Sequence, residues 1–219
     1  MWMEVPNGHK AAWMIPTTTD PIFVLLAGGQ SVRMGEDKGF VPIGPDSHFL
    51  SHILKTLNKF STSLYVSLRK EQVDSYSKYI QKPSLILDKE LTVEGPLKGI
   101  LSSYIYLKDN NLLNDFIFVL PIDIPFIEEK TIQRLLDTIK GRSRSIPGIF
   151  YESNTGLEPL CGIYTTQTLS QWMASLSIPG KQEFSLQKRI KILEPKPLFI
   201  KLPDEEESSF RNINSKNDL

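Results

Sequence analysis

Residues 21–39 read PIFVLLAGGQSVRMGEDKG and join a short apolar run to a segment rich in glycine and cations. The run Ile22–Leu26 has the length and apolarity of a buried strand. Gly28 and Gly29 follow it almost directly, and Lys38 closes the segment. The sequence therefore predicts a glycine-rich loop immediately behind the first strand of the domain.

This loop has the composition of a phosphate-binding segment. Its glycines let the backbone turn sharply and approach a ligand without a Cβ in the way, so that successive N–H groups can point at phosphate oxygens. Arg33 and Lys38 add positive charge on side chains long enough to reach a triphosphate. The loop has neither the G-x-G-x-x-G nor the Walker pattern, so a tight turn with two surface cations remains the alternative.

From Pro21 onward, apolar runs alternate with segments of helical period, which is typical of a parallel α/β sheet with crossover helices. Strands are expected at Ile22–Leu26, Leu64–Leu68, Leu85–Leu87, Phe116–Leu120, Ile146–Phe150 and Leu157–Tyr164. Helices are expected at Leu50–Leu57, Glu71–Tyr79, Leu97–Ile105, Ile132–Ile139 and Leu169–Leu176. Phe116–Leu120 is the most apolar strand and is predicted to be central. The acidic run Asp204–Ser209 is expected to be a solvated loop.

Two further segments put carboxylates at predicted strand ends. Asp123 lies in PIDIP behind the most apolar strand, where open α/β sheets bind ligands, and a carboxylate there could hold a divalent cation that bridges nucleotide phosphates. Asp88 follows the strand Leu85–Leu87, and Gly95 with Pro96 opens the next helix. The alternatives are that Asp123 caps a turn before a proline and that Asp88 lies in a surface loop.

Composition narrows the function classes. The chain has 219 residues with 25 basic and 25 acidic side chains and a formal net charge of +0, so binding to nucleic acid or a membrane through bulk charge is not expected. The single cysteine, Cys161, favours a reducing, cytoplasmic location. No apolar run approaches the roughly 20 residues of a membrane span. Residues 1–20 are expected to be a tail, and residues 21–219 one domain.

The segments LAGGQSVRMGEDKG, Asp88 with EGPLKGI, and PIDIP, in this order, resemble the MobA-like nucleotidyltransferase family that includes the molybdenum cofactor guanylyltransferases. EPLCGIY at 158–164 and FRNINS at 210–215 are also similar to the family. The resemblance implies an α/β fold, a Rossmann-like three-layer sandwich around a mostly parallel, mixed central sheet. It also implies transfer of GMP from GTP to the terminal phosphate of molybdopterin with Mg²⁺ as cofactor and release of pyrophosphate.

The same resemblance assigns roles to individual residues. Asp123 would hold Mg²⁺, and Lys38 would contact the phosphates. The charge on Arg33 adds our own hypothesis that catalysis depends on Arg33, Lys38 and Asp123. Nucleotide contacts would come from Leu26, Ala27, Gly28, Gly29, Lys38, Asp88, Gly95 and Asp123, with Asn212 and Asn214 similar to the family's pair near the pterin. The expected partners are GTP and molybdopterin, and a molybdoenzyme or its chaperone would receive the product.

The chain departs from the family pattern at two positions. The family's guanylyl branch often has an asparagine near the end of the second strand, where Ser67 is the nearest substitute in hydrogen-bonding capacity. Lys98 stands where a small residue is usual, and we expect it to be a solvated helix side chain and not a phosphate contact. Transfer of CMP to the pterin, nucleotidyl transfer to a sugar or alcohol phosphate, and a non-catalytic nucleotide-binding module remain as alternatives.

Overall fold

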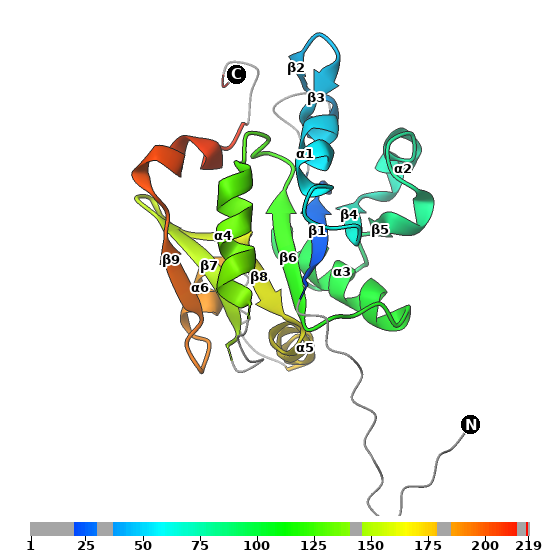
Figure 1. Ribbon diagram of the computed structural model, residues 1–219. Coiled ribbons are helices and arrows are strands. Elements are labelled where there is room, and N and C mark those ends of the chain that lie inside the picture. Colours follow the sequence, from blue (N-terminus) through cyan, green and yellow to red (C-terminus); the bar gives the residue numbers. More distant parts are fainter. Residues whose placement is uncertain (1–19, 30–36, 141–145, 179–184, 214–217, 219) are drawn as a thin grey trace, which may run out of the picture.

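The computed structural model describes residues 20–29, 37–140, 146–178, 185–213 and 218. A seven-stranded sheet runs through the middle of this part of the chain in the order β5-β4-β1-β6-β8-β7-β9 (Figure 1). Its strands are β1 (Ile22–Leu26), β4 (Leu64–Leu68), β5 (Leu85–Leu87), β6 (Phe116–Pro121), β7 (Gly148–Ser153), β8 (Gly156–Thr165) and β9 (Leu198–Lys201). A separate hairpin consists of β2 (Pro42–Gly44) and β3 (Ser47–His48).

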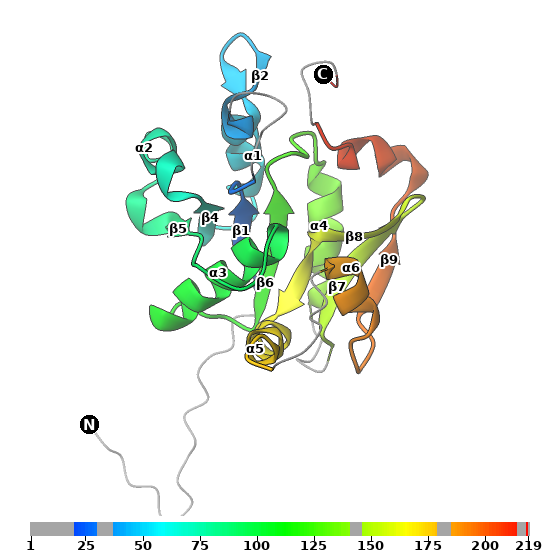
Figure 2. The ribbon, with the colours of Figure 1, turned by 180° about the vertical axis from the view of Figure 1, so that it is seen from behind.

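Helices cover both faces of the sheet. One face, toward the viewer in Figure 1, carries α1 (Phe49–Leu57) and α4 (Glu129–Ile139). The other face, toward the viewer in Figure 2, carries α3 (Pro96–Asp109), α5 (Thr166–Ser175) and α6 (Leu186–Lys191). The short helix α2 (Val73–Tyr76) lies beyond β4. The predicted three-layer α/β fold with a mostly parallel, mixed sheet is confirmed.

The sequence of β1 follows from this layering. Phe23 and Leu25 belong to the core under α1 and α4, whereas Ile22, Val24 and Leu26 belong to the core under α3 and α5. All five side chains are buried. A strand covered on both faces is apolar without interruption, which is why this run showed no alternation of polar and apolar residues.

The chain order reverses at β1. Strand β1 pairs in parallel with β4 on one side and with β6 on the other, and β4 pairs in parallel with β5. The chain thus moves outward from β1 to β5 and then returns to the opposite side of β1 as β6. Such a switch point leaves a crevice beyond the carboxyl ends of the two central strands, and ligands of open α/β sheets bind there.

Most predicted elements are present with small shifts. The predicted central strand Phe116–Leu120 forms most of β6, the fourth of the seven strands. The predicted helix Glu71–Tyr79 is shorter, with a 3-10 turn η2 (Lys70–Gln72) leading into α2. The hairpin, α6 and β9 were not predicted. No helix in the described ranges is long and apolar enough to cross a membrane.

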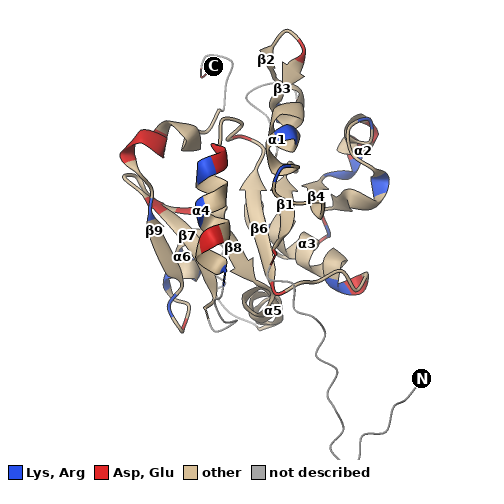
Figure 3. Ribbon diagram, in the orientation of Figure 1, with Lys and Arg blue, Asp and Glu red and all other residues tan. Residues whose placement is uncertain are grey.

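The prediction of a solvated loop at Asp204–Ser209 is wrong. These residues form the 3-10 helix η4 (Asp204–Phe210), which lies beside α4 (Figure 3). Glu206 is only 1% exposed, and its carboxylate accepts hydrogen bonds from Arg134 at 2.6 and 2.8 Å and from Thr131 at 2.6 Å. The hydrogen bonds from Arg134 are the main reason that the pKa of Glu206 falls from 4.5 to about 2. One carboxylate of the acidic run thus fastens η4 to α4.

We expect Glu206→Gln to lower the free energy of unfolding by about 2–3 kcal/mol, because it removes one member of a buried charged network. The lowered pKa means that this stabilisation is present above the unfolded value of 4.5 and is lost as the pH falls toward about 2. Urea unfolding at several pH values should therefore show the difference between wild type and variant shrinking below about pH 4.5. Glu205→Gln, at an exposed neighbour, is the matched control. Equal stability of wild type and Glu206→Gln at neutral pH would contradict the assignment.

Candidate active site

A cavity of about 730 Å³ lies beyond the carboxyl ends of the parallel strands. The segments that follow β1, β4, β5 and β6 all contribute to it, together with the first turn of α3. The residues that line this cavity include Leu26, Gly28, Gly29, Lys38, Ser67, Arg69, Asp88, Gly95, Lys98, Gly99 and Asp123. The volume is that of a typical small-molecule site.

Lys38 and Asp123 meet on one side of this cavity although 85 positions separate them. Lys38 begins the 3-10 turn η1 (Lys38–Phe40), and Asp123 follows β6 by two residues. The Lys38 Nζ donates to Asp123 Oδ2 at 3.2 Å, and the two side chains are 16% and 26% exposed. This pair sits at the switch point between β1 and β6.

The second oxygen of Asp123 is the feature of the site that calls for a ligand. Oδ1 is buried and accepts no hydrogen bond from the described residues. A buried carboxylate oxygen without a donor is costly, and a divalent cation would satisfy it. The described ranges contain no cluster of three or more His, Cys, Asp or Glu side chains that could hold a metal ion. The open oxygen of Asp123 fits Mg²⁺, which is usually bound by one or two carboxylates plus phosphates and water.

Asp88 lies on the opposite side of the cavity. Its Oδ1 accepts a hydrogen bond from the Ser67 hydroxyl at 2.6 Å. Burial raises the pKa of Asp88, while this hydrogen bond and the positive charges of Lys98 and Arg69 act in the opposite direction. The other oxygen lies against the backbone of Gly28, so closely that a Cβ at position 28 would overlap it. Gly28 thus makes room for a side chain of the site as well as for a ligand.

The phosphate-loop candidate is tied down at both ends by buried polar side chains. Asp37 accepts hydrogen bonds from the Gln72 amide at 2.6 Å, from the Tyr76 hydroxyl at 2.9 Å and from the Gly39 N–H at 2.9 Å. The same Gln72 amide donates to the Ala27 carbonyl at 3.1 Å. Burial, more than the neighbouring Asp37, raises the pKa of Tyr76, so the phenol stays neutral and donates. Nothing in the sequence pattern indicated Gln72 or Tyr76.

The entrance to α3 forms another wall of the cavity. Gly95 precedes the helix with a φ of 64°, a conformation that favours glycine, and Pro96 occupies the first turn. Gly99 packs close to Ser67 and to Leu26, and a Cβ at this position would lie only 3.0 Å from Ser67 Oγ. Lys98 was expected to be solvated, but it is half-buried and lines the cavity. Its positive charge lowers the pKa of Asp88, against the larger effect of burial.

The remaining predicted residues have different positions. Ala27 lies behind the cavity wall, fixed through its carbonyl and through its N–H, which donates to Ser67 O at 2.8 Å. Asn212 is exposed and is not among the lining residues, but the N–H of its neighbour Ile213 donates to Asp123 O at 2.8 Å. Arg33, Asn214 and all but the last residue of the predicted tail lie outside the described residues.

This fold and cavity define an α/β protein with a small-molecule site at the switch point of its sheet. The chain belongs to the MobA-like NTP transferase family, whose domain pattern matches residues 23–190. The family assignment made from the three motifs is therefore confirmed.

Individual members of the family are similar to this chain over most of their length. A protein of Thermococcus sibiricus named probable molybdenum cofactor guanylyltransferase is 30% identical over 200 residues, which cover 90% of this chain and 95% of the relative. A protein of the same name from Methanothermobacter thermautotrophicus is 29% identical over 196 residues, 89% of this chain and 95% of the relative. The crystal structure of molybdopterin-guanine dinucleotide biosynthesis protein A from Archaeoglobus fulgidus has the same fold, with a TM-score of 0.66 at 19% identity over 90% of this chain and 93% of that one.

The contact between Gly28 and Asp88 can be tested with a pair of neighbouring glycines. We expect Gly28→Ala to lower the free energy of unfolding by about 1–2 kcal/mol, because the new methyl group displaces the Asp88 carboxylate from Ser67. Gly29→Ala is the matched control, since its Cβ would meet nothing within 4 Å. Chemical denaturation of the two variants measures the difference. Equal destabilisation by both substitutions would show that the glycine at position 28 does not make room for Asp88.

Proposed function

We propose that this protein is a molybdenum cofactor guanylyltransferase, which transfers GMP from GTP to the terminal phosphate of molybdopterin and releases pyrophosphate. The observation that carries the proposal is the pair of Lys38 and Asp123 at the switch point, with the buried Oδ1 of Asp123 left to accept a cation. The names of the relatives with similar sequences support the choice of guanylyl transfer to this acceptor.

In this proposal the triphosphate lies against the loop that follows β1. The backbone at Gly28 and Gly29 lines the cavity and offers N–H groups to the phosphate oxygens, while Ala27 holds the start of the loop in place through its bond to Ser67. Lys38 adds a positive charge whose position is fixed by its ion pair with Asp123. Asp88 and Gly95 lie farther along the cavity and contact the nucleoside. Arg33, in the same loop, is proposed as a second phosphate-binding cation.

The chemical step is an in-line displacement at the α-phosphorus of GTP. An oxygen of the pterin phosphate forms the new P–O bond, and the bond to the bridging oxygen breaks, so that pyrophosphate leaves with the electron pair. A phosphate monoester has its second pKa near about 6 and is already anionic at neutral pH, so no general base is needed. Catalysis therefore depends on positioning and on stabilising the charge that develops on pyrophosphate.

The residues of this chain divide that work. Lys38 would stabilise the negative charge of the leaving pyrophosphate, and Asp123 would hold both Lys38 and Mg²⁺. Mg²⁺, when bound, supplies positive charge that offsets the charge on the phosphate oxygens. Asn212 and Asn214 are proposed to lie on the pterin side of the site, because the Ile213 N–H between them is bonded to the Asp123 carbonyl.

Pyrophosphate release from purified protein with Mg²⁺, molybdopterin and either GTP or CTP tests the proposal. We expect release with GTP that depends on molybdopterin. A preference for CTP would replace guanylyl by cytidylyl transfer. Absence of release with either nucleotide, despite nucleotide binding, would favour the non-catalytic module.

Lys38→Met and Asp123→Asn should each reduce kcat by about 10²–10³-fold, as removal of one charge-stabilising group does in other enzymes. The control is Asp74→Asn, which removes an exposed carboxylate on α2 that is not among the cavity-lining residues. Both site variants should keep the wild-type melting temperature within a few degrees. Wild-type turnover by either of them at saturating Mg²⁺ would refute the mechanism.

A further inference from the structure

Arg69 is a cation of the cavity that no motif singled out. It directly follows β4 and is one of the lining residues. Its backbone is fixed, because its N–H donates to the Gln72 side chain at 2.8 Å. Its side chain is 33% exposed, and Nη1 lies 3.0 Å from a carboxylate oxygen of the more exposed Glu71. The position of Arg69 is therefore set by the same glutamine that ties down the loop after β1.

The guanidinium of Arg69 has unsatisfied hydrogen-bonding capacity. Its Nε is buried and has no hydrogen-bond partner among the described residues. A buried N–H without an acceptor costs free energy, and a ligand that supplies an acceptor recovers it. Arginine is suited to this role because its planar fork donates two parallel hydrogen bonds.

Asp88, which lines the same cavity, indicates the chemistry of the ligand. Arg69 ends β4 and Asp88 ends the neighbouring strand β5, close enough for the arginine to lower the pKa of the carboxyl group. A fork of donors and an acceptor thus line the same cavity. Guanine carries the complementary groups on adjoining edges: N7 and O6 accept hydrogen bonds, whereas N1–H and the N2 amino group donate them. Adenine has a donating amino group in place of O6, and cytosine also presents an amino group.

The order of the strands separates this pair from the phosphate-binding pair. Arg69 and Asp88 follow β4 and β5, whereas Lys38 and Asp123 lie by β1 and β6. The Asp88 carboxylate reaches back toward β1, to Ser67 and to the backbone of Gly28. A nucleotide laid along this edge of the sheet, with its phosphates at Lys38, brings its base over β4 and β5.

We propose that Arg69 determines base specificity by donating hydrogen bonds to O6 and N7 of guanine while Asp88 faces the N1 and N2 edge. This inference rests on the proposed function, since it concerns the base of the nucleotide that is bound there. Arg69 is a specificity residue and takes no part in bond formation at the phosphorus. We assign recognition of the base to Arg69 and not to Ser67, because the Ser67 hydroxyl already donates its hydrogen bond to Asp88.

Calorimetric affinities of the full chain for GTP, 7-deaza-GTP and ATP test the assignment atom by atom. Wild type should bind 7-deaza-GTP about tenfold more weakly than GTP, the effect of losing one of two paired hydrogen bonds. Arg69→Met, which has no donor, should bind GTP and 7-deaza-GTP equally, and its preference for GTP over ATP should be smaller by about tenfold or more. Arg69→Lys, which keeps the charge and can still donate to O6 or N7, should retain part of the discrimination.

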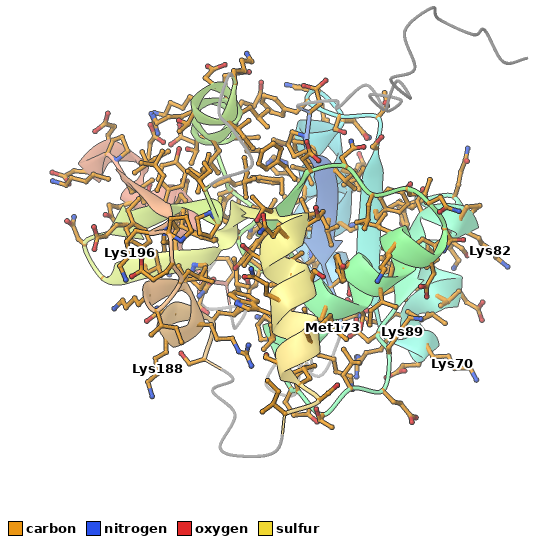
Figure 4. All side chains as sticks on the ribbon, turned by 90° about the horizontal axis from the view of Figure 1, so that it is seen from below. Lys70, Lys82, Lys89, Met173, Lys188 and Lys196 are labelled. Carbon is orange, nitrogen blue, oxygen red and sulfur yellow. The ribbon has the colours of Figure 1, made fainter. Side chains whose placement is uncertain are left out.

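Lys82→Gln is the control for loss of a positive charge. Lys82 is exposed in the turn η3 (Lys82–Ser84) at the periphery of the molecule (Figure 4) and does not line the cavity. We expect this variant to retain the wild-type ratios for all three nucleotides.

The possible results distinguish the inference from the proposed function. If wild type prefers another nucleotide over GTP, the proposed function is wrong. If wild type prefers GTP but binds 7-deaza-GTP equally tightly, or if Arg69→Met keeps the preference over ATP, the inference is wrong while guanylyl transfer stands. If Arg69→Met fails to fold, Arg69→Gln takes its place, and a wild-type preference for GTP over ATP in that variant would overturn the inference.

Discussion

The parallel pairing of β1 with both β4 and β6 is the constraint on which the site depends. In this register Leu26 is level with Ser67 on one side and with Pro121 on the other. The residues just beyond these positions therefore emerge side by side at one edge of the sheet. A slip of β4 by one residue would turn Ser67 to the opposite face, away from Asp88. Because β1 is apolar on both faces, burial alone does not select this register. The polar groups of the cavity nevertheless take their positions from it.

A second requirement is that the chain must return to the edge of β1 after the glycine loop. Gln72 meets it by bonding to Ala27 at the beginning of the loop and to Asp37 at its end. Asp37 is immediately followed by Lys38, so this tether delivers the lysine to Asp123. The acidic segment η4 helps to position Asp123 through the C-terminal residues. Glu206 holds η4 on α4, and the N–H of Ile213, which follows η4, donates to the Asp123 carbonyl. Lys38, Asp123 and the C-terminal segment are thus positioned by buried polar contacts between distant parts of the chain.

These contacts mark the boundary of what could be predicted from the sequence. Ile22–Leu26 and Phe116–Leu120 were recognisable as buried strands because apolar composition alone identifies them, and glycine, lysine and aspartate at strand ends indicated the cavity. Gln72 and Arg69 were missed because a polar residue in a weakly periodic segment gives no local sign of burial. Glu206 was misinterpreted for the same reason: within an acidic run, only the facing Arg134 distinguishes it from its solvated neighbours. The burial of these side chains depends on partners far away in the sequence. A single sequence does not show which distant residues will lie close to them.

The most direct test of the account is a crystal structure of the protein with Mg²⁺ and a GTP analogue that has a carbon bridge between the α- and β-phosphorus. The account predicts phosphates against Gly28 and Lys38, the cation on Asp123 Oδ1 and the base beside Asp88, all at the carboxyl edge between β5 and β6. A nucleotide bound elsewhere, or a cation bound in this site without Asp123, would contradict it.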